Sequence, residues 1–183
     1  PVYREYDLSF RFAVCHNDDA LYVAVEVIDD VINSDSCPDG AISCPAWDDD
    51  AVEVFIDGNH NHAEDARAND RADLKFGGEF ALVANGAANS DYSGYPKSFG
   101  REDTWQGSVK QVQLPGGIPA VRYEFRISWN MMGLNARPDR IGFNISVQDD
   151  DDGGRRDHAL YFVGNPSRPF VDERYFADLI LKD

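Results

Sequence analysis

A tryptophan and a glutamate six residues apart, Trp47 and Glu53, are the side chains of this 183-residue chain best suited to binding a polar ligand. Trp47 stands between Pro45 and a run of aspartates, so we expect it on a loop, where an exposed indole offers a flat apolar face and an N–H donor. The axial C–H groups of a sugar stack on such a face. The alternative is a tryptophan folded over the edge of the core, because tryptophan is usually largely buried. Glu53 alternates with Val52 and Val54, which places it on the outer face of a strand, either as a hydrogen-bond acceptor for hydroxyl groups or as an ordinary solvated acid.

A second group of polar side chains, His60 and His62 with Asp57 and Glu64 nearby, offers the nitrogen and oxygen ligands that transition metals accept. A His-x-His pattern on a strand would direct both imidazoles to the same side. Here the pattern falls in a stretch predicted to be a loop, and a solvated polar loop explains the same residues. Both interpretations stay open.

Catalytic signatures are missing from the sequence. A glycoside hydrolase needs two carboxylates about 5–10 Å apart beside a cleft, and a chain with 33 acidic residues offers many pairs, Glu53 with Glu124 among them. No Gly-x-Ser-x-Gly elbow, phosphate-binding loop or dinucleotide fingerprint is present. The sequence therefore favours a binding domain over an enzyme.

Composition and charge narrow the range of partners. The 33 acidic and 17 basic residues give a net charge of −16, which repels nucleic acids and anionic membrane surfaces. No apolar run approaches the roughly 18 residues of a membrane span. The aspartate runs 48–50 and 149–152 suit hard cations, and they would equally serve as a solubilising surface. We expect a soluble domain that binds neither nucleic acid nor membrane, and its abrupt start close to a strand favours a piece of a longer protein.

Alternation of apolar and polar residues with a period of two predicts β-strands along most of the chain. The inward-facing positions of the five clearest strands are Leu8, Phe10, Phe12 and Val14; Leu21, Val23, Val25 and Val27; Val52, Val54 and Ile56; Val121, Tyr123, Phe125 and Ile127; and Ile141, Phe143, Ile145 and Val147. Further strands are expected at 73–84, 106–114, 158–163 and 175–182, and the one helical candidate is 129–134. Turn-forming residues separate these segments at the spacing of a sandwich or barrel. We therefore predict one domain, 1–183, with an all-β fold: an antiparallel, jelly-roll-like β-sandwich with minimal helix.

Long irregular stretches are expected at 30–49, 58–72, 85–104 and 164–174, and loops of this length are usually binding loops or mobile. The first contains Trp47 and also Cys37 and Cys44, which could close a small disulfide loop or remain free thiols. A bridge would favour an extracellular or periplasmic location. Cys15 would be left over.

Three segments resemble, in this order, the family 9 carbohydrate-binding modules. They are 21–27 (Leu-Tyr-Val-Ala-Val-Glu-Val), 47–57 (Trp-x-x-Asp-x-Val-Glu-x-Phe-Ile-Asp) and 141–144 (Ile-Gly-Phe-Asn), the last leading into an aspartate run. The resemblance covers most of the chain and continues to 175–181. It implies a β-sandwich that binds sugars and normally tethers an enzyme to polysaccharide.

The resemblance also implies roles for particular residues. In the family, a tryptophan just before such a strand stacks on the sugar and an acid six residues later hydrogen-bonds its hydroxyls, and Trp47 and Glu53 match this pattern. The next strand brings a basic side chain, for which Lys75 is the nearest candidate. A second tryptophan follows the acidic loop in the family, whereas this chain has 158–162 (His-Ala-Leu-Tyr-Phe) there, so Tyr161 is the expected substitute.

Two polar strand faces are second-rank candidates, suited to hydroxyl recognition or to plain cross-strand pairing. Their members are Arg122, Glu124 and Arg126 on one strand and Asn144, Ser146 and Gln148 on another. Arg155 and Arg156, after the acidic run, are expected to neutralise it locally.

Calcium is implied by the same resemblance, because family 9 modules hold structural calcium near strand ends. Calcium takes about six to eight oxygen ligands, and no single run supplies them: the aspartate run fails as an EF-hand because its twelfth position is Leu160. Several strand ends would have to converge. Asp30 and Asp149, at the ends of two predicted strands, and Asp50, at the start of a third, are the expected ligands, with a charged turn as the alternative.

Two functions follow. The first is a non-catalytic, calcium-stabilised module that binds mono- or oligosaccharides or polysaccharide chain ends through Trp47, Glu53, Lys75 and Tyr161. The second keeps the fold but assigns a structural or adhesive role in a larger surface protein with no sugar bound, and a buried Trp47 would favour it.

Overall fold

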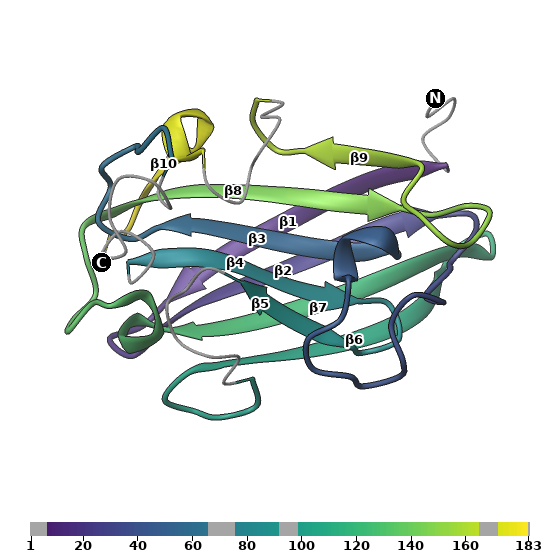
Figure 1. Ribbon diagram of the computed structural model, residues 1–183, viewed down its shortest axis with the longest axis horizontal. Helices are drawn as coiled ribbons and strands as arrows, with labels where there is room; N and C mark the ends of the chain where they lie inside the picture. Colours follow the sequence, from purple (N-terminus) through teal and green to yellow (C-terminus); the bar gives the residue numbers. More distant parts are fainter. Residues whose placement is uncertain (1–6, 66–75, 92–98, 165–171, 183) are drawn as a thin grey trace.

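The fold is a sandwich of two antiparallel sheets (Figure 1), which confirms the predicted fold class. A computed structural model describes residues 7–65, 76–91, 99–164 and 172–182, and every structural statement below concerns these residues. One sheet has the strand order β1 (Leu8–His16), β2 (Ala20–Asp29), β7 (Ile118–Ser128), β6 (Trp105–Leu114). The other has the order β10 (Ala177–Ile180), β8 (Arg140–Asp149), β3 (Ala51–Asp57), β4 (Gly77–Val83), β5 (Ala88–Asp91), with β9 (His158–Tyr161) also paired to β8.

The core lies between the sheets and is built from the alternating positions that the sequence predicts. Val23 and Val25 from β2, Val54 from β3 and Ile145 from β8 are all fully buried in one cluster. Phe12 on β1 is only partly buried, although it packs against the same cluster, because β1 is an edge strand. The burial of these apolar side chains is the main favourable term in folding of the domain.

Strand β3 differs from a half-buried strand, because all of its seven residues are buried. Its outer face is covered by irregular segments from elsewhere in the chain. Cys37 and Ala46 pack on Ala51 of β3, together with small apolar residues of β4 and the turn that follows it. At the other end of the strand the ring of Phe176 lies 6.2 Å from that of Phe55, centroid to centroid. Strand β3 is therefore packed on both faces, against the core on one side and against these segments on the other.

Single 3-10 turns complete the described part of the fold, at η1 (Ala46–Asp48), η3 (Trp129–Met132) and η4 (Glu173–Tyr175). The helical candidate at 129–134 is thus a 3-10 turn, which Ser128 caps by accepting a hydrogen bond from the Asn130 amide. Gly133 ends it with a φ of 71°, a left-handed conformation that favours glycine. Strand β5 lies within the stretch expected to be irregular, and the described part of the predicted strand 73–84 begins at Gly77.

No helix within the described ranges is both long enough and apolar enough to cross a membrane.

Candidate functional site

Strand pairing places five outward-facing residues in one row across the six-stranded sheet. Ser146 of β8 pairs with Tyr161 of β9 on one side and with Glu53 of β3 on the other. Glu53 pairs in turn with Ala81 of β4, which pairs with Asn89 of β5. Alternation along each strand puts all five on the face opposite the core. Two of the predicted ligand residues, Glu53 and Tyr161, are therefore brought together by register alone.

Glu53 lies on the outer sheet face, as expected, but it is only 4% exposed. Its Oε2 accepts hydrogen bonds from Ser146 Oγ at 2.7 Å and from Gln148 Nε2 at 2.5 Å. The Gln148 side-chain oxygen accepts in turn from a guanidinium nitrogen of Arg156 at 2.5 Å. Arg156 thus turns towards the sheet and joins this network, which differs from the expected neutralisation of the acidic run. A carboxylate, an amide and a guanidinium are linked in one chain of hydrogen bonds.

Tyr161 stands half-buried at the edge of this network. Burial raises the pKa of its hydroxyl above the usual value, and the charge of Arg156 opposes that rise. The phenol therefore stays protonated at neutral pH and can donate a hydrogen bond as well as offer an aromatic face.

Trp47 lies at the surface, with 43% of its area exposed, on the single turn η1 that precedes β3. The turn packs against β3 and β4. A disulfide joins Cys37 to Cys44 just before it, and the Ala46 amide donates to the Cys44 carbonyl at 2.8 Å. The indole is thus not folded into the core, and its backbone is fixed by covalent and hydrogen bonds. Lys75, the predicted basic residue, lies outside the described residues.

Three buried aspartates, Asp29, Asp50 and Asp149, converge at one end of the sandwich, with ligand oxygens within 4.8 Å of one another. Burial raises their pKa values, to about 8 for Asp29, about 7 for Asp50 and about 6 for Asp149, and the charges of neighbouring aspartates add to the rise. Asp50 and Asp149 come together as expected. Asp30 is exposed and belongs to an adjacent group with Asp29 and Asp151.

A second carboxylate group, formed by Asp35, Asp49 and Asp150, lies beside the first. The two are joined by the Asp150 amide, which donates to Asp50 Oδ1 at 2.8 Å. Among the described residues, the buried Oδ2 atoms of Asp49 and Asp150 have no hydrogen-bond partner. Buried carboxylates without a partner are costly, and a cation relieves that cost. Sets composed only of oxygen ligands fit a hard cation such as calcium.

The sequence as a whole matches the family model described as Carbohydrate family 9 binding domain-like, over residues 2–183. The chain belongs to this family. Family 9 carbohydrate-binding modules are non-catalytic, so the prediction that the chain is not an enzyme is confirmed.

Two solved structures of family 9 modules from Caldicellulosiruptor kristjanssonii share the fold. One, in complex with cellotriose, superposes with a TM-score of 0.70 at 23% identity, covering 96% of this chain and 75% of that chain. The other, in complex with glucose, gives 0.69 at 22% identity, covering 96% and 77%. No curated protein matches the sequence significantly. At these identities the likeness concerns the fold.

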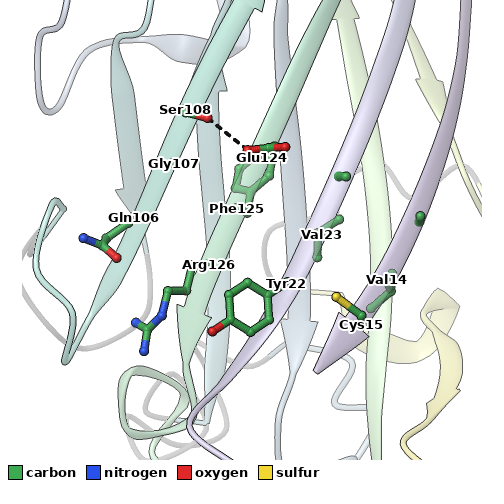
Figure 2. A pocket seen from close by; sticks show the side chains of 12 residues that line it. Val14, Cys15, Tyr22, Val23, Gln106, Gly107, Ser108, Glu124, Phe125 and Arg126 are labelled. Atoms are coloured by element: carbon green, nitrogen blue, oxygen red, sulfur yellow. Dashed lines mark hydrogen bonds between the residues drawn. The ribbon is translucent and has the colours of Figure 1, made fainter. Parts of the chain in front are cut away.

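This family 9 module also has a groove on the outer face of its four-stranded sheet, with a volume of about 520 Å³ (Figure 2). Cys15, Tyr22, Arg126 and Gln106 form one row across the four strands, in the lower part of Figure 2. The next row contains Ala13 and Ala24, whose small side chains leave the hollow, together with Glu124 and Ser108. Glu124 and Arg126, second-rank candidates from the sequence, thus lie on the opposite sheet from Trp47.

Several residues of the candidate sites are not singled out by the sequence, although a signal exists for one. Asp29 continues the inward alternation of Val25 and Val27, just as Asp149 continues that of Val147, and this parity could have identified it instead of Asp30. Asn89 has no such signal, because β5 contains no alternating apolar residues.

Proposed function

We propose that this module binds neutral sugars at the outer face of the six-stranded sheet, between the Trp47 indole and the polar row of Glu53. The observation that carries the proposal is the hydrogen-bonded network of Glu53, Ser146, Gln148 and Arg156, which begins six residues after an exposed tryptophan. A buried carboxylate within hydrogen-bond reach of an amide and a hydroxyl is the kind of group that sugar recognition needs.

The network supports hydroxyl recognition in a specific way. Each interior member already has a partner, so Gln148 and Ser146 are held in one orientation before a ligand arrives. Low local dielectric strengthens hydrogen bonds made there. Arg156 supplies donors at the exposed end, in a fixed planar fork. The Trp47 face and the half-buried Tyr161 ring would contribute apolar contact with the sugar ring.

The choice of first ligands follows from the two similar structures, whose complexes contain cellotriose and glucose. Neutral sugars also suit the net charge of −16, which disfavours anionic glycans. We therefore propose glucose and short β-glucan chains, or the ends of such chains in polysaccharide, as the ligand class.

We further propose that calcium stabilises the module. Asp29, Asp50 and Asp149 would hold one ion and Asp35, Asp49 and Asp150 another, because each set gathers at least two buried carboxylates. A bound cation would supply the counter-charge that these carboxylates lack. It would also tie the segment before β3 to the ends of β2 and β8, and so hold the turn that carries Trp47.

An extracellular or periplasmic location, as part of a larger carbohydrate-active or surface protein, is proposed on the disulfide between Cys37 and Cys44. A buried Trp47 would have favoured the alternative function, a structural or adhesive domain with no sugar bound. The exposed indole favours sugar binding instead.

The test is isothermal titration of the calcium-saturated protein with glucose, cellobiose, cellotriose and xylobiose, on wild type, Trp47→Ala and Tyr22→Ala. Tyr22 is a matched control, since it is an aromatic side chain in the groove of the other sheet. We expect binding to glucose or cello-oligosaccharides that Trp47→Ala abolishes and Tyr22→Ala leaves unchanged. Binding lost only in Tyr22→Ala would place the sugar in the groove and overturn the proposed site. An absence of heat with every sugar would support the adhesive role.

A further inference from the structure

A second cluster of ligand-type side chains lies far from the proposed sugar site, at the opposite end of β3. Strand β3 begins beside η1 and ends near β10 (Figure 1). There His60 Nε2 lies 2.8 Å from Asp178 Oδ1 and 3.2 Å from His62 Nε2, and His62 Nε2 lies 3.5 Å from the same carboxylate oxygen. Three ligand atoms, two nitrogens and one oxygen, therefore face one another.

The tautomer of His62 is fixed by its second nitrogen. His62 Nδ1 lies 3.3 Å from the backbone carbonyl oxygen of Glu173, which can only accept, so Nδ1 carries the hydrogen. In the neutral ring, Nε2 then presents a lone pair to His60 and Asp178. An imidazole whose outer nitrogen donates to a backbone carbonyl is the usual arrangement of a histidine metal ligand.

The backbone that presents the two histidines is held in an uncommon conformation. His60 and His62 have φ values of 54° and 51°, in the left-handed region that few non-glycine residues occupy. The carboxylate of Asp57 accepts hydrogen bonds from the amides of Asn61 at 3.2 Å and His62 at 3.0 Å. The 57–62 segment is thus held in a defined conformation with both histidines half-buried.

A row across three strands provides the frame for this loop. Gly142 of β8 pairs with Asp57 of β3 on one side and with Asp178 of β10 on the other. A Cβ at position 142 would lie 2.8 Å from the Asp57 Cβ, so only glycine leaves Asp57 in place. Asp178 Oδ2 lies 3.6 Å from Arg140, which leaves Oδ1 directed at the histidines.

We propose that His60, His62 and Asp178 form a binding site for a divalent transition cation of the zinc type. Zinc bonds of about 2.0–2.1 Å to nitrogen and oxygen give tetrahedral edges of about 3.3 Å, and the three distances of 2.8, 3.2 and 3.5 Å bracket that value. Two imidazoles and one carboxylate suit zinc, cobalt or nickel better than calcium, which prefers oxygen. Three protein ligands leave a fourth position for water. The site would join the loop after β3 to β10, independently of sugar binding.

The experiment is a titration with cobalt(II), a spectroscopic stand-in for zinc, of chelator-treated protein kept in excess calcium so that the aspartate groups are occupied. The ligand variants are His60→Asn, His62→Asn and Asp178→Asn, since asparagine tolerates the left-handed backbone at the two histidine positions. The matched control is His16→Asn, a histidine in β1 whose Nε2 lies 3.1 Å from the backbone carbonyl oxygen of Lys182. Circular dichroism checks that each variant is folded.

We expect wild type and His16→Asn to bind one cobalt ion per chain with a visible tetrahedral absorption band that zinc displaces. Each ligand variant should weaken binding by at least about 100-fold, because the loss of even an outer-shell partner costs about 10–100-fold. A wild type with no such band, or a band that persists in the folded His60→Asn/His62→Asn double variant, would overturn the proposal. So would a band lost equally in His16→Asn.

Discussion

Gln148 donates a hydrogen bond to Glu53 across the β3–β8 pair, with 2.5 Å between Nε2 and Oε2. Arg156 donates to the other end of the same amide, so the orientation of the Gln148 side chain is fixed by a carboxylate on one side and a guanidinium on the other. An amide held in this way cannot rotate to suit a different ligand. At the proposed sugar site, such an amide would select one arrangement of hydroxyl groups.

Replacing Gln148 with alanine should weaken sugar binding by about 10-fold or more, because the Glu53 carboxylate would lose the amide that holds it in place. A hydrogen bond from a sugar hydroxyl to a charged group contributes about 1.5–3 kcal/mol, and 1.4 kcal/mol corresponds to a factor of ten. Calorimetric titration of the variant measures the loss. Gln113→Ala, on the exposed face of β6, is the control and should bind as wild type does. Equal affinity in Gln148→Ala and wild type would contradict a role for the network in binding.

Removing calcium should lower the unfolding temperature. An ion present at 100 times its Kd stabilises the folded state by about 2.7 kcal/mol, which for a domain of this size corresponds to about 5–10 °C. Thermal unfolding in calcium and in chelator measures the difference. Asp50→Asn should reduce the difference by at least half, whereas Asp48→Asn, outside the carboxylate groups, should preserve it. An identical midpoint with and without chelator would argue against a structural ion.

Loss of the disulfide should destabilise the domain by about 2–3 kcal/mol, the chain-entropy value for a short loop. Cys37 and Cys44 are seven positions apart, and Cys37 is buried in one apolar cluster with Ala46 and Ala51. Urea unfolding of the Cys37→Ser/Cys44→Ser variant gives the change in the free energy of unfolding. Cys15→Ser, which replaces an exposed free thiol, should leave stability unchanged. A double variant as stable as wild type would show that the bridge adds nothing.

The stability of the domain should depend on pH through the Glu26 carboxylate. Arg122 and Arg11 each donate to its carboxylate at 2.8 Å, and the hydrogen bond from Arg122 is the largest cause that lowers the pKa of Glu26. Because the folded pKa is below the unfolded one, the stabilisation is present above the ordinary value and is lost as the pH falls through the folded pKa.

The predicted effect is small, because both arginines are exposed and solvent screens the pairs. Glu26→Gln should cost less than about 1 kcal/mol at neutral pH, and the difference from wild type should vanish in strong acid. Urea midpoints of both proteins across a series of acidic buffers provide the comparison. A difference that stays constant with pH would mean that packing, not charge, is responsible.

Most of the fold follows from the sequence, because alternation in strands such as β2 and β8 reports which side chains face the core. The burial of Glu53 does not, since the segments that cover the outer face of β3 come from distant parts of the chain. The position of Trp47 on an exposed turn could be predicted from its proline and aspartate neighbours. Which of Asp29 and Asp30 faces the core could also have been predicted, because strand parity can be read from the sequence. The convergence of His60 with Asp178 could not, because it depends on the packing of β10 beside the loop after β3.

The attachment of η1 on both sides has a thermodynamic consequence for the affinity of the module. Its backbone is held by the Cys37–Cys44 bridge before it, and after it the Asp49 and Asp50 carboxylates accept hydrogen bonds from the amides of Ser36 and Asn33. The conformational entropy of this segment is therefore lost during folding, so a ligand need not order it. Even a single sugar ring, with few contacts to offer, could bind there measurably. Reduction of the bridge would transfer that entropic cost to the binding step.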